Sequence, residues 1–137
     1  MDWIDDNVAV GNRWDAYSWR RLKKEGVDAI IDVRPFFDQK YGKYDRRPNV
    51  PKVERSADLV LTLAKQGTKV LVRCREGKDR SAFVAMVYVA KRYGLSYKEA
   101  YEKVKAKRRI TVYHWDWVDM LPALEGQSVD QLSDEKP

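Results

Sequence analysis

The chain has 137 residues, of which 44% are hydrophobic and 35% charged, and its formal net charge at pH 7 is +6. This length fits one domain with a buried core, and no apolar run reaches the roughly 18 residues that a membrane-spanning helix needs. A lone cysteine excludes an internal disulfide and suits a reducing compartment, so we expect a cytoplasmic, monomeric protein whose charge favours anionic partners.

The first part of the chain alternates apolar segments with an amphipathic one. Residues 29–33 predict a strand. Before it, Asp15 has a side chain of the type that caps a helix. We expect that helix over residues 16–25, with Gly26 ending it.

The middle of the chain begins with a segment rich in turn residues. Residues 34–52 contain three prolines and many charges, which predicts a long loop. From Val53 onward, apolar residues recur at helical spacing, which predicts a helix ending near Gly67. Residues 69–72 then predict a strand, and residues 81–90 form an apolar run too long for a strand, which predicts a helix.

The C-terminal part of the chain predicts two more helices. Ser96 followed by Glu99 forms a capping box, so we expect a helix to begin there. A last helix is predicted within residues 110–124, with Trp115, Val118 and Leu121 on its buried side. Residues 1–124 are expected to form a single domain, and the polar residues 125–137 a C-terminal tail.

This alternation of strands and helices predicts an α/β fold with a central, mainly parallel sheet flanked by helices. In such folds, ligands bind at the carboxyl ends of the strands. Cys74 follows the predicted strand over residues 69–72, and we therefore expect it at the ligand-binding edge of the sheet.

Cys74 opens a polar loop that leads from this strand into an apolar helix. A thiol attacks as the thiolate, which positive potential favours. Successive backbone N–H groups around an anion, followed by a helix N-terminus, supply that potential and bind phosphate. The sequence therefore predicts Cys74 as a nucleophile within a phosphate-binding loop of Arg75, Glu76, Gly77, Lys78, Asp79 and Arg80.

Three residues of this segment suit that chemistry further. Gly77 permits a positive φ and a close backbone approach. Arg80, six positions after Cys74, can fold back and hold two phosphate oxygens with its guanidinium. Ser81 is expected to cap the following helix, and its hydroxyl can donate to the sulfur when the thiolate leaves. The alternative for Cys74 is a small buried side chain without reactivity.

The arrangement of Cys74, five further residues, Arg80 and Ser81 resembles the signature of the cysteine-dependent protein tyrosine phosphatase superfamily, specifically its compact dual-specificity members. The resemblance extends from about residue 3 to residue 124, except for residues 35–50, and it implies an opening strand over residues 3–11. It implies hydrolysis of phosphotyrosine, and of phosphoserine or phosphothreonine, in protein substrates through a phosphocysteine. No cofactor is implied, and one histidine with one cysteine does not supply a usual zinc site.

The resemblance also implies a general acid, an aspartate about thirty residues before the cysteine. Asp45 lies 29 positions before Cys74 and matches that place best. Asp38, 36 positions before, is the competitor. Asp79, within the loop itself, is a third candidate that fits a role in loop shape or substrate contact better. Any of these carboxylates can instead be a solvated turn residue.

The residue before the cysteine departs from the family pattern. Arg73 precedes the cysteine where the family has a histidine. A positive charge can still favour the thiolate, but the fixed hydrogen-bond geometry of an imidazole is missing. The only histidine of the chain, His114, lies between aromatic residues, and we interpret it as a partly buried member of an aromatic cluster rather than a catalytic base.

Three alternative functions remain open at this point. The segment Ile31–Pro35 resembles the early strand of rhodanese-like sulfurtransferases. The basic residues Arg75 and Lys78 resemble those of phosphatases acting on phosphoinositides, inositol phosphates or RNA 5′ ends, and they allow an anionic, phosphate-rich ligand. Replacement of the usual histidine by Arg73 also permits a phosphate-binding module without catalysis.

Overall fold

The computed structural model describes residues 1–39 and 46–124. Its centre is a four-stranded sheet in the order β1-β2-β6-β3, in which β2, β6 and β3 run parallel and β1 runs antiparallel to β2. These strands are β1 (Asp2–Trp3), β2 (Val8–Gly11), β3 (Ala29–Asp32) and β6 (Val70–Arg73). The predicted α/β class with a mainly parallel sheet is confirmed.

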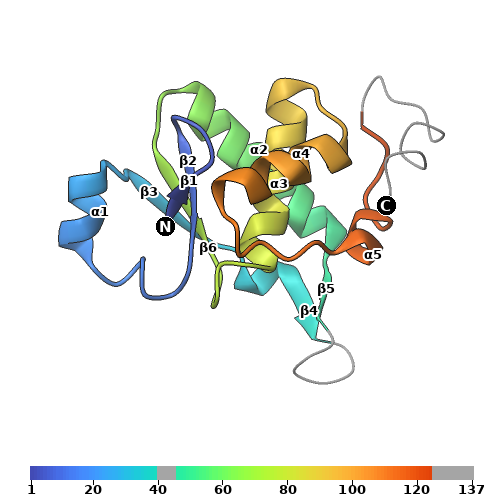
Figure 1. Ribbon diagram of the computed structural model, residues 1–137, viewed down its shortest axis with the longest axis horizontal. Coiled ribbons are helices and arrows are strands. Elements are labelled where there is room, and N and C mark those ends of the chain that lie inside the picture. The colour runs from blue at the N-terminus through green and yellow to red at the C-terminus, as the bar shows by residue number, and fades with distance from the viewer. Residues whose placement is uncertain (40–45, 125–137) are drawn as a thin grey trace.

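Helices lie on both sides of this sheet (Figure 1). They are α1 (Trp19–Glu25), α2 (Val50–Lys65), α3 (Arg80–Tyr93), α4 (Tyr97–Lys107) and α5 (Trp115–Val118). Side chains along β6 alternate between the faces, so that Val70 and Val72 enter the main core while Leu71 packs with Leu22 of α1. Within the described ranges, no helix is long and apolar enough to cross a membrane.

Helix α3 runs through the centre of the main core. The side chains from Ala82 to Ala90 are each at most 2% exposed. A helix that is apolar all round must be covered all round, and α2, α4 and the sheet provide that cover. The core therefore holds the N-terminus of α3, which follows Cys74, in a fixed position.

The N-terminal elements differ from the prediction in two ways. The opening strand is a hairpin of β1 and β2, because Asp5 accepts hydrogen bonds from the amides of Asn7 and Val8 and turns the chain. Helix α1 begins at Trp19 with Ser18 as its N-cap. The predicted cap Asp15 is instead buried and accepts from the amide of Asn12. Gly26 ends α1 with a φ of 81°, as predicted.

The predicted long loop over residues 34–52 contains regular structure. A 3₁₀ turn (Arg34–Phe36) leads into β4 (Phe37–Gln39), which pairs antiparallel with β5 (Arg46–Pro48). Helix α2 then begins at Val50, earlier than predicted, with Asn49 as its N-cap. Proline fits the first turn of a helix and the edge of a hairpin, so the prolines that predicted a loop sit at element boundaries instead.

The last predicted helix is much shorter than expected. Only Trp115–Val118 is helical within residues 110–124, and Trp117 rather than Trp115 is the buried tryptophan. The Tyr101 hydroxyl accepts from the amide of His114 and holds the preceding segment extended. The start of α4 is confirmed, since Ser96 Oγ accepts from the amide of Glu99. The predicted tail over residues 125–137 lies outside the described residues.

Candidate active site

The loop between β6 and α3 starts at the carboxyl end of the central strand, as predicted for a ligand site. Gly77 lies within it with a φ of 71°, a conformation that other residues rarely adopt. A Cβ at this position would lie 2.6 Å from the carbonyl oxygen of Gly11 and 2.5 Å from Nη2 of Arg108. Glycine is therefore required here both for backbone conformation and for close packing.

The sulfur of Cys74 lies at the base of this loop and has polar neighbours. The Gly77 amide donates a hydrogen bond to Sγ at 3.2 Å, and Ser81 Oγ lies 3.2 Å from the same sulfur. Cys74 is 1% exposed, so these two groups provide much of the polar environment of a thiolate formed there. The loop backbone has curled back onto the sulfur, which is the arrangement expected of an anion-binding loop.

Ser81 does not cap α3, contrary to our prediction. The N-cap is Asp79, and Ser81 lies inside the first turn, where its hydroxyl faces the sulfur. The same Oγ lies 3.4 Å from the carbonyl oxygen of Gly11 and can donate to it. Ser81 therefore connects Cys74 with the neighbouring strand β2.

A cavity of about 440 Å³ opens over this loop. Its lining joins the loop to the hairpin and to the segment around α5, and consists of Arg46, Cys74, Arg75, Glu76, Lys78, Asp79, Arg80, His114 and Trp117. Cys74 and the predicted phosphate-binding residues other than Gly77 thus line one space. Cations outnumber carboxylates in this lining, so the cavity is suited to an anion.

Arg80 begins α3 and is 8% exposed. Burial, together with the nearby cations Arg46 and Arg34, lowers the pKa of the Arg80 guanidinium, while Cys74 opposes that shift. A guanidinium remains protonated even so. Arg80 is thus a desolvated cation beside the sulfur, the setting in which binding a phosphate anion brings the largest electrostatic gain.

Asp79 and His114 meet at this cavity. His114 Nε2 lies 2.7 Å from Asp79 Oδ1, and the imidazole stacks on Trp117 with ring centroids 3.6 Å apart. The hydrogen bond with His114 holds the pKa of Asp79 below its usual value, against the opposing effect of burial. The predicted aromatic surroundings of His114 are confirmed. Its contact with the loop was not predicted, because the two residues are 35 positions apart.

Arg73, in the position where the family has histidine, is directed toward strand β3. Its Nη1 lies 3.8 Å from Asp32 Oδ2 and is buried without a hydrogen-bond partner among the described residues. Burial raises the pKa of Asp32, but the hydrogen bonds from Arg34 and the charge of Arg73 outweigh it and lower that pKa overall. Arg73 therefore adds positive charge behind Cys74.

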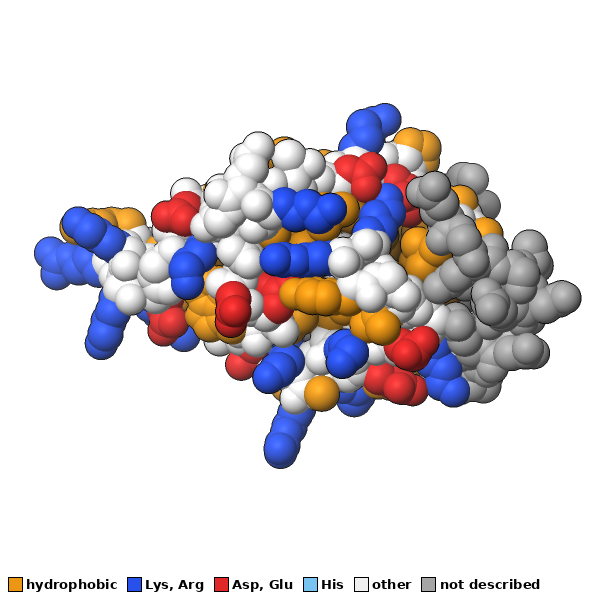
Figure 2. Space-filling model, turned by 90° about the horizontal axis from the view of Figure 1, so that it is seen from above, with side chains coloured by type: hydrophobic (Ala, Val, Ile, Leu, Met, Phe, Trp, Pro, Cys, Tyr) orange, Lys and Arg blue, Asp and Glu red, His pale blue; other side chains and the backbone are white. Residues whose placement is uncertain are grey.

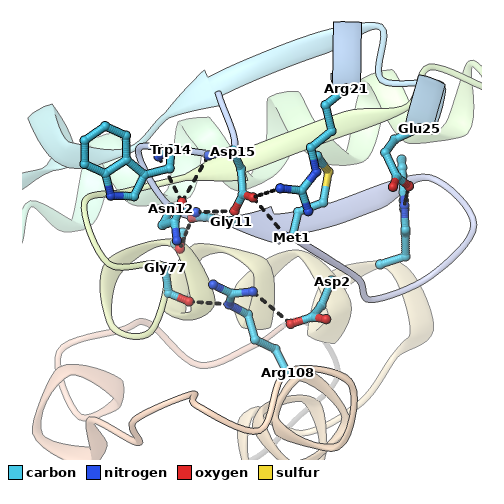
Figure 3. Close-up of polar contacts among 12 residues, drawn as sticks. Met1, Asp2, Gly11, Asn12, Trp14, Asp15, Arg21, Glu25, Gly77 and Arg108 are labelled. Carbon is cyan, nitrogen blue, oxygen red and sulfur yellow. Dashed lines mark hydrogen bonds and ion pairs between the residues drawn. The ribbon is translucent and has the colours of Figure 1, made fainter. Parts of the chain in front are cut away.

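Arg108 ties the loop to two distant parts of the chain (Figure 3). From the end of α4, its Nε donates to the carbonyl oxygen of Gly77 at 2.5 Å, and its Nη1 donates to Asp2 Oδ2 at 2.8 Å. The side chain is almost fully buried between these acceptors. Nothing in the local sequence pattern around Arg108 reveals this contact.

Of the two main candidates for the general acid, only Asp38 lies among the residues that the structure describes. Asp45, the first choice, lies outside the described residues. Asp38 lies on β4 opposite Arg47 and is not among the residues that line the cavity. Among residues 1–39 and 46–124, no group of three or more His, Cys, Asp and Glu side chains is arranged to hold a metal ion.

Comparison with known proteins agrees with this geometry. The family described as "Dual specificity phosphatase, catalytic domain" matches residues 18–127. Protein phosphatase Slingshot of Drosophila melanogaster is 29% identical over 97% of this chain, and human Protein phosphatase Slingshot homolog 1 is 30% identical over 90% of it. This chain spans only 14% and 13% of the lengths of those two relatives.

Solved structures show the same fold. The crystal structure of human DUSP28 superposes with a TM-score of 0.73 at 18% identity, over 88% of this chain and 94% of that one. The structure titled Tk-PTP in the active form has a TM-score of 0.67 at 19% identity, over 96% of this chain and 95% of that one. The chain belongs to the dual-specificity phosphatase catalytic domains of the cysteine-dependent protein tyrosine phosphatase superfamily.

Proposed function

We propose that this domain is a protein phosphatase that hydrolyses phosphotyrosine, and phosphoserine or phosphothreonine, through a phosphocysteine. The observation that carries the proposal is the position of Cys74 Sγ, 3.2 Å from both the Gly77 amide and Ser81 Oγ, in a cavity that Arg80 also lines. This group of residues suits a thiolate nucleophile facing a bound phosphate.

The reaction uses the loop in two steps. In the first, the Cys74 thiolate attacks phosphorus, a P–S bond forms and the P–O bond to the substrate breaks. Arg80 and the backbone amides of residues 75–80 hold the other phosphate oxygens as charge develops on them. In the second step, water attacks phosphorus, inorganic phosphate leaves and the thiolate is regenerated, with the Ser81 hydroxyl donating to the departing sulfur.

Residues around the loop complete the proposed site. Arg75, Glu76, Lys78 and Asp79 line the phosphate-binding cavity, in which the two cations add attraction for the substrate dianion. The thiolate persists in a reducing compartment, which supports a cytoplasmic location for the activity.

The proposal is tested with para-nitrophenyl phosphate as substrate and a chelator in the buffer. Wild type is expected to release phosphate. Cys74→Ser is expected to lose turnover by at least a thousandfold, because a serine hydroxyl is a far weaker nucleophile at neutral pH than a thiolate. The variant should still bind tungstate, measured by calorimetry, since the loop amides and Arg80 remain. Equal turnover by both proteins, or none by either, would exclude the mechanism.

Asp45 is proposed as the general acid that protonates the leaving oxygen. Asp45→Asn is expected to lower kcat about 100-fold on phenyl phosphate, whose leaving group is a poor one. It should also remove the decrease in kcat that occurs when this carboxyl loses its proton as the pH rises. The matched control is Asp38→Asn, which should change kcat less than twofold. The assignment fails if the two variants exchange these effects or if Asp45→Asn leaves the pH profile intact.

A further inference from the structure

The segment between β2 and α1, together with the first residue of α1, exposes three large aromatic side chains. Trp14 is 65% exposed, Tyr17 75% and Trp19 67%. The rings of Trp14 and Tyr17 lie next to each other, with centroids 5.9 Å apart, and contiguous exposed apolar area of this kind is typical of binding surfaces. We call these three side chains the aromatic rim.

Arg13, the residue before Trp14, is bonded to the phosphate-binding loop. The Arg13 amide donates to the carbonyl oxygen of Arg75 at 3.1 Å, and Arg13 Nη1 donates to Glu76 Oε1 at 3.3 Å. Figure 1 shows the segment that leads from β2 to α1 and the segment that leads from β6 to α3 along the same, lower edge of the molecule. The segment that carries the rim is therefore in contact with Arg75 and Glu76, two residues that line the cavity.

Arg34 adds a further positive charge on this side of the molecule. Its guanidinium is hydrogen-bonded to Asp32 at 2.7 Å, and that bond is the main reason why the pKa of Arg34 is raised.

The backbone that carries the rim is already ordered. Asn12 Oδ1 accepts from the amides of Trp14 and Asp15 at 2.9 and 3.0 Å, and Asp15 Oδ2 accepts from the Asn12 amide. Figure 3 shows the ring of Trp14 directed away from this network. A surface that is fixed before binding loses little entropy when a partner docks.

Positive charge accompanies the rim without forming a continuous basic patch. The guanidinium of Arg13 lies 4.9 Å from the ring centroid of Trp14, and that of Arg20 lies 5.6 Å from the ring centroid of Trp19. Figure 2 shows further basic side chains at the α1 end of the molecule. However, Glu76 and Asp32 pair with Arg13 and Arg34, so carboxylates are interspersed among the cations.

This mixture indicates which partner fits. A polyanion such as RNA, or a strongly anionic membrane, would bring its charges against Glu76 and Asp32 as well as against the arginines. A peptide with one or two carboxylates beside a large apolar side chain meets the exposed arginines and the aromatic rings and avoids that repulsion. Tryptophan, tyrosine and arginine are also the residues that contribute most at protein interfaces.

We propose that Trp14, Tyr17 and Trp19, together with Arg20, form a docking surface for the residues that flank the phosphorylated residue of a protein substrate. The surface selects flanks that carry Asp or Glu next to a large apolar side chain. The inference rests on the proposed phosphatase function and extends it to the class of substrate.

The test compares two phosphotyrosine peptides of equal length, one with Glu and Leu flanking the phosphotyrosine and one with Ser and Gly, alongside para-nitrophenyl phosphate. Wild type is expected to show a kcat/KM about tenfold higher for the first peptide, which corresponds to about 1.4 kcal/mol. The double variant Trp14→Ala/Trp19→Ala, and separately Arg20→Glu, should each lose most of that preference through KM. Both should hydrolyse para-nitrophenyl phosphate within twofold of wild type.

Leu59→Ala serves as the matched control, since Leu59 is 50% exposed on α2, which packs against the opposite face of the sheet from α1. It should leave all three substrates unchanged. Equal loss on para-nitrophenyl phosphate and on peptide in the rim variants would indicate general damage to the site and overturn the proposal, as would an unchanged peptide preference.

Binding measurements separate this proposal from the proposed activity. Calorimetry with Cys74→Ser measures peptide affinity in the absence of turnover, with and without the rim substitutions. Rim-dependent affinity for the acidic peptide supports docking even if wild type releases no phosphate, in which case only the activity is wrong. If a single-stranded RNA oligonucleotide or phosphatidylserine vesicles bind in a rim-dependent way and the peptide does not, the partner class is wrong.

Discussion

Asp79 places a carboxylate within a loop whose proposed ligand is a phosphate dianion. Left alone, this carboxylate would repel that ligand. The hydrogen bond from His114 Nε2 at 2.7 Å draws the carboxylate toward α5, and stacking on Trp117 fixes the imidazole that makes the bond. His114 is therefore a positioning residue, which acts on the phosphate site through Asp79.

His114→Ala is expected to raise the KM for para-nitrophenyl phosphate three- to tenfold, because the Asp79 carboxylate then loses the group that orients it and offsets its charge. This corresponds to roughly 1 kcal/mol. Steady-state kinetics at pH 6 and pH 8 measure the effect, with kcat expected to change less than KM. In the double variant His114→Ala/Asp79→Asn, KM should return toward the wild-type value. A double variant as impaired as His114→Ala would show that the histidine only supports the local packing.

Asp5 joins two secondary-structure elements, the β1–β2 turn and helix α3. Its carboxylate accepts from the amides of Asn7 and Val8, both at 2.8 Å, and from the hydroxyls of Tyr88 and Tyr93 at 2.6 and 2.7 Å. Burial raises the pKa of Asp5, but these hydrogen bonds outweigh burial and hold the pKa below its ordinary value of 3.8. The ionised form is therefore bound more favourably in the folded protein than in the unfolded chain.

Because its pKa is lowered on folding, Asp5 contributes stability that is present above its ordinary pKa of 3.8 and is lost as the pH falls through the lower folded value. Asp5→Ala is expected to reduce the free energy of unfolding at pH 7 by about 2 kcal/mol. Thermal unfolding followed by circular dichroism should show the gap to wild type narrowing below pH 4. The exposed neighbour gives the control, and Asp6→Ala should change Tm little at any pH. A gap independent of pH would contradict the assigned role of the charge.

At the scale of elements, periodicity and caps predicted those helices whose signals are local. The Ser96–Glu99 pair marks the start of α4, and the apolar run after Ser81 marks α3. The hairpin of β4 and β5 was predicted as a loop because its strands have only three residues each, too few for alternation to register. Asp15 is of a residue type that caps helices. Its buried carboxylate instead accepts hydrogen bonds from the N-terminal amine of Met1 and from the amide of Asn12.

At the scale of the whole molecule, the site is assembled from segments far apart in the chain. The spacing of Cys74, Gly77 and Arg80 could be recognised in the sequence, because the loop and the N-terminus of the helix that follows it are adjacent in the chain. The contacts of Arg108 with Gly77 and of His114 with Asp79 span 31 and 35 positions. Neither leaves a periodic signal, since each depends on how α4 and α5 dock, so neither could be predicted from the sequence.

The sheet order gives β6 a neighbour on each side, with β2 on one edge and β3 on the other. To release this strand, the protein must break two parallel ladders and uncover α3 at the same time. In terms of amide exchange, β6 is thus among the segments that open last, and its protection reports the global unfolding of the domain. Cys74, the proposed nucleophile, therefore follows one of the most persistent segments of the structure, whereas the surface proposed to select its substrate lies on the periphery.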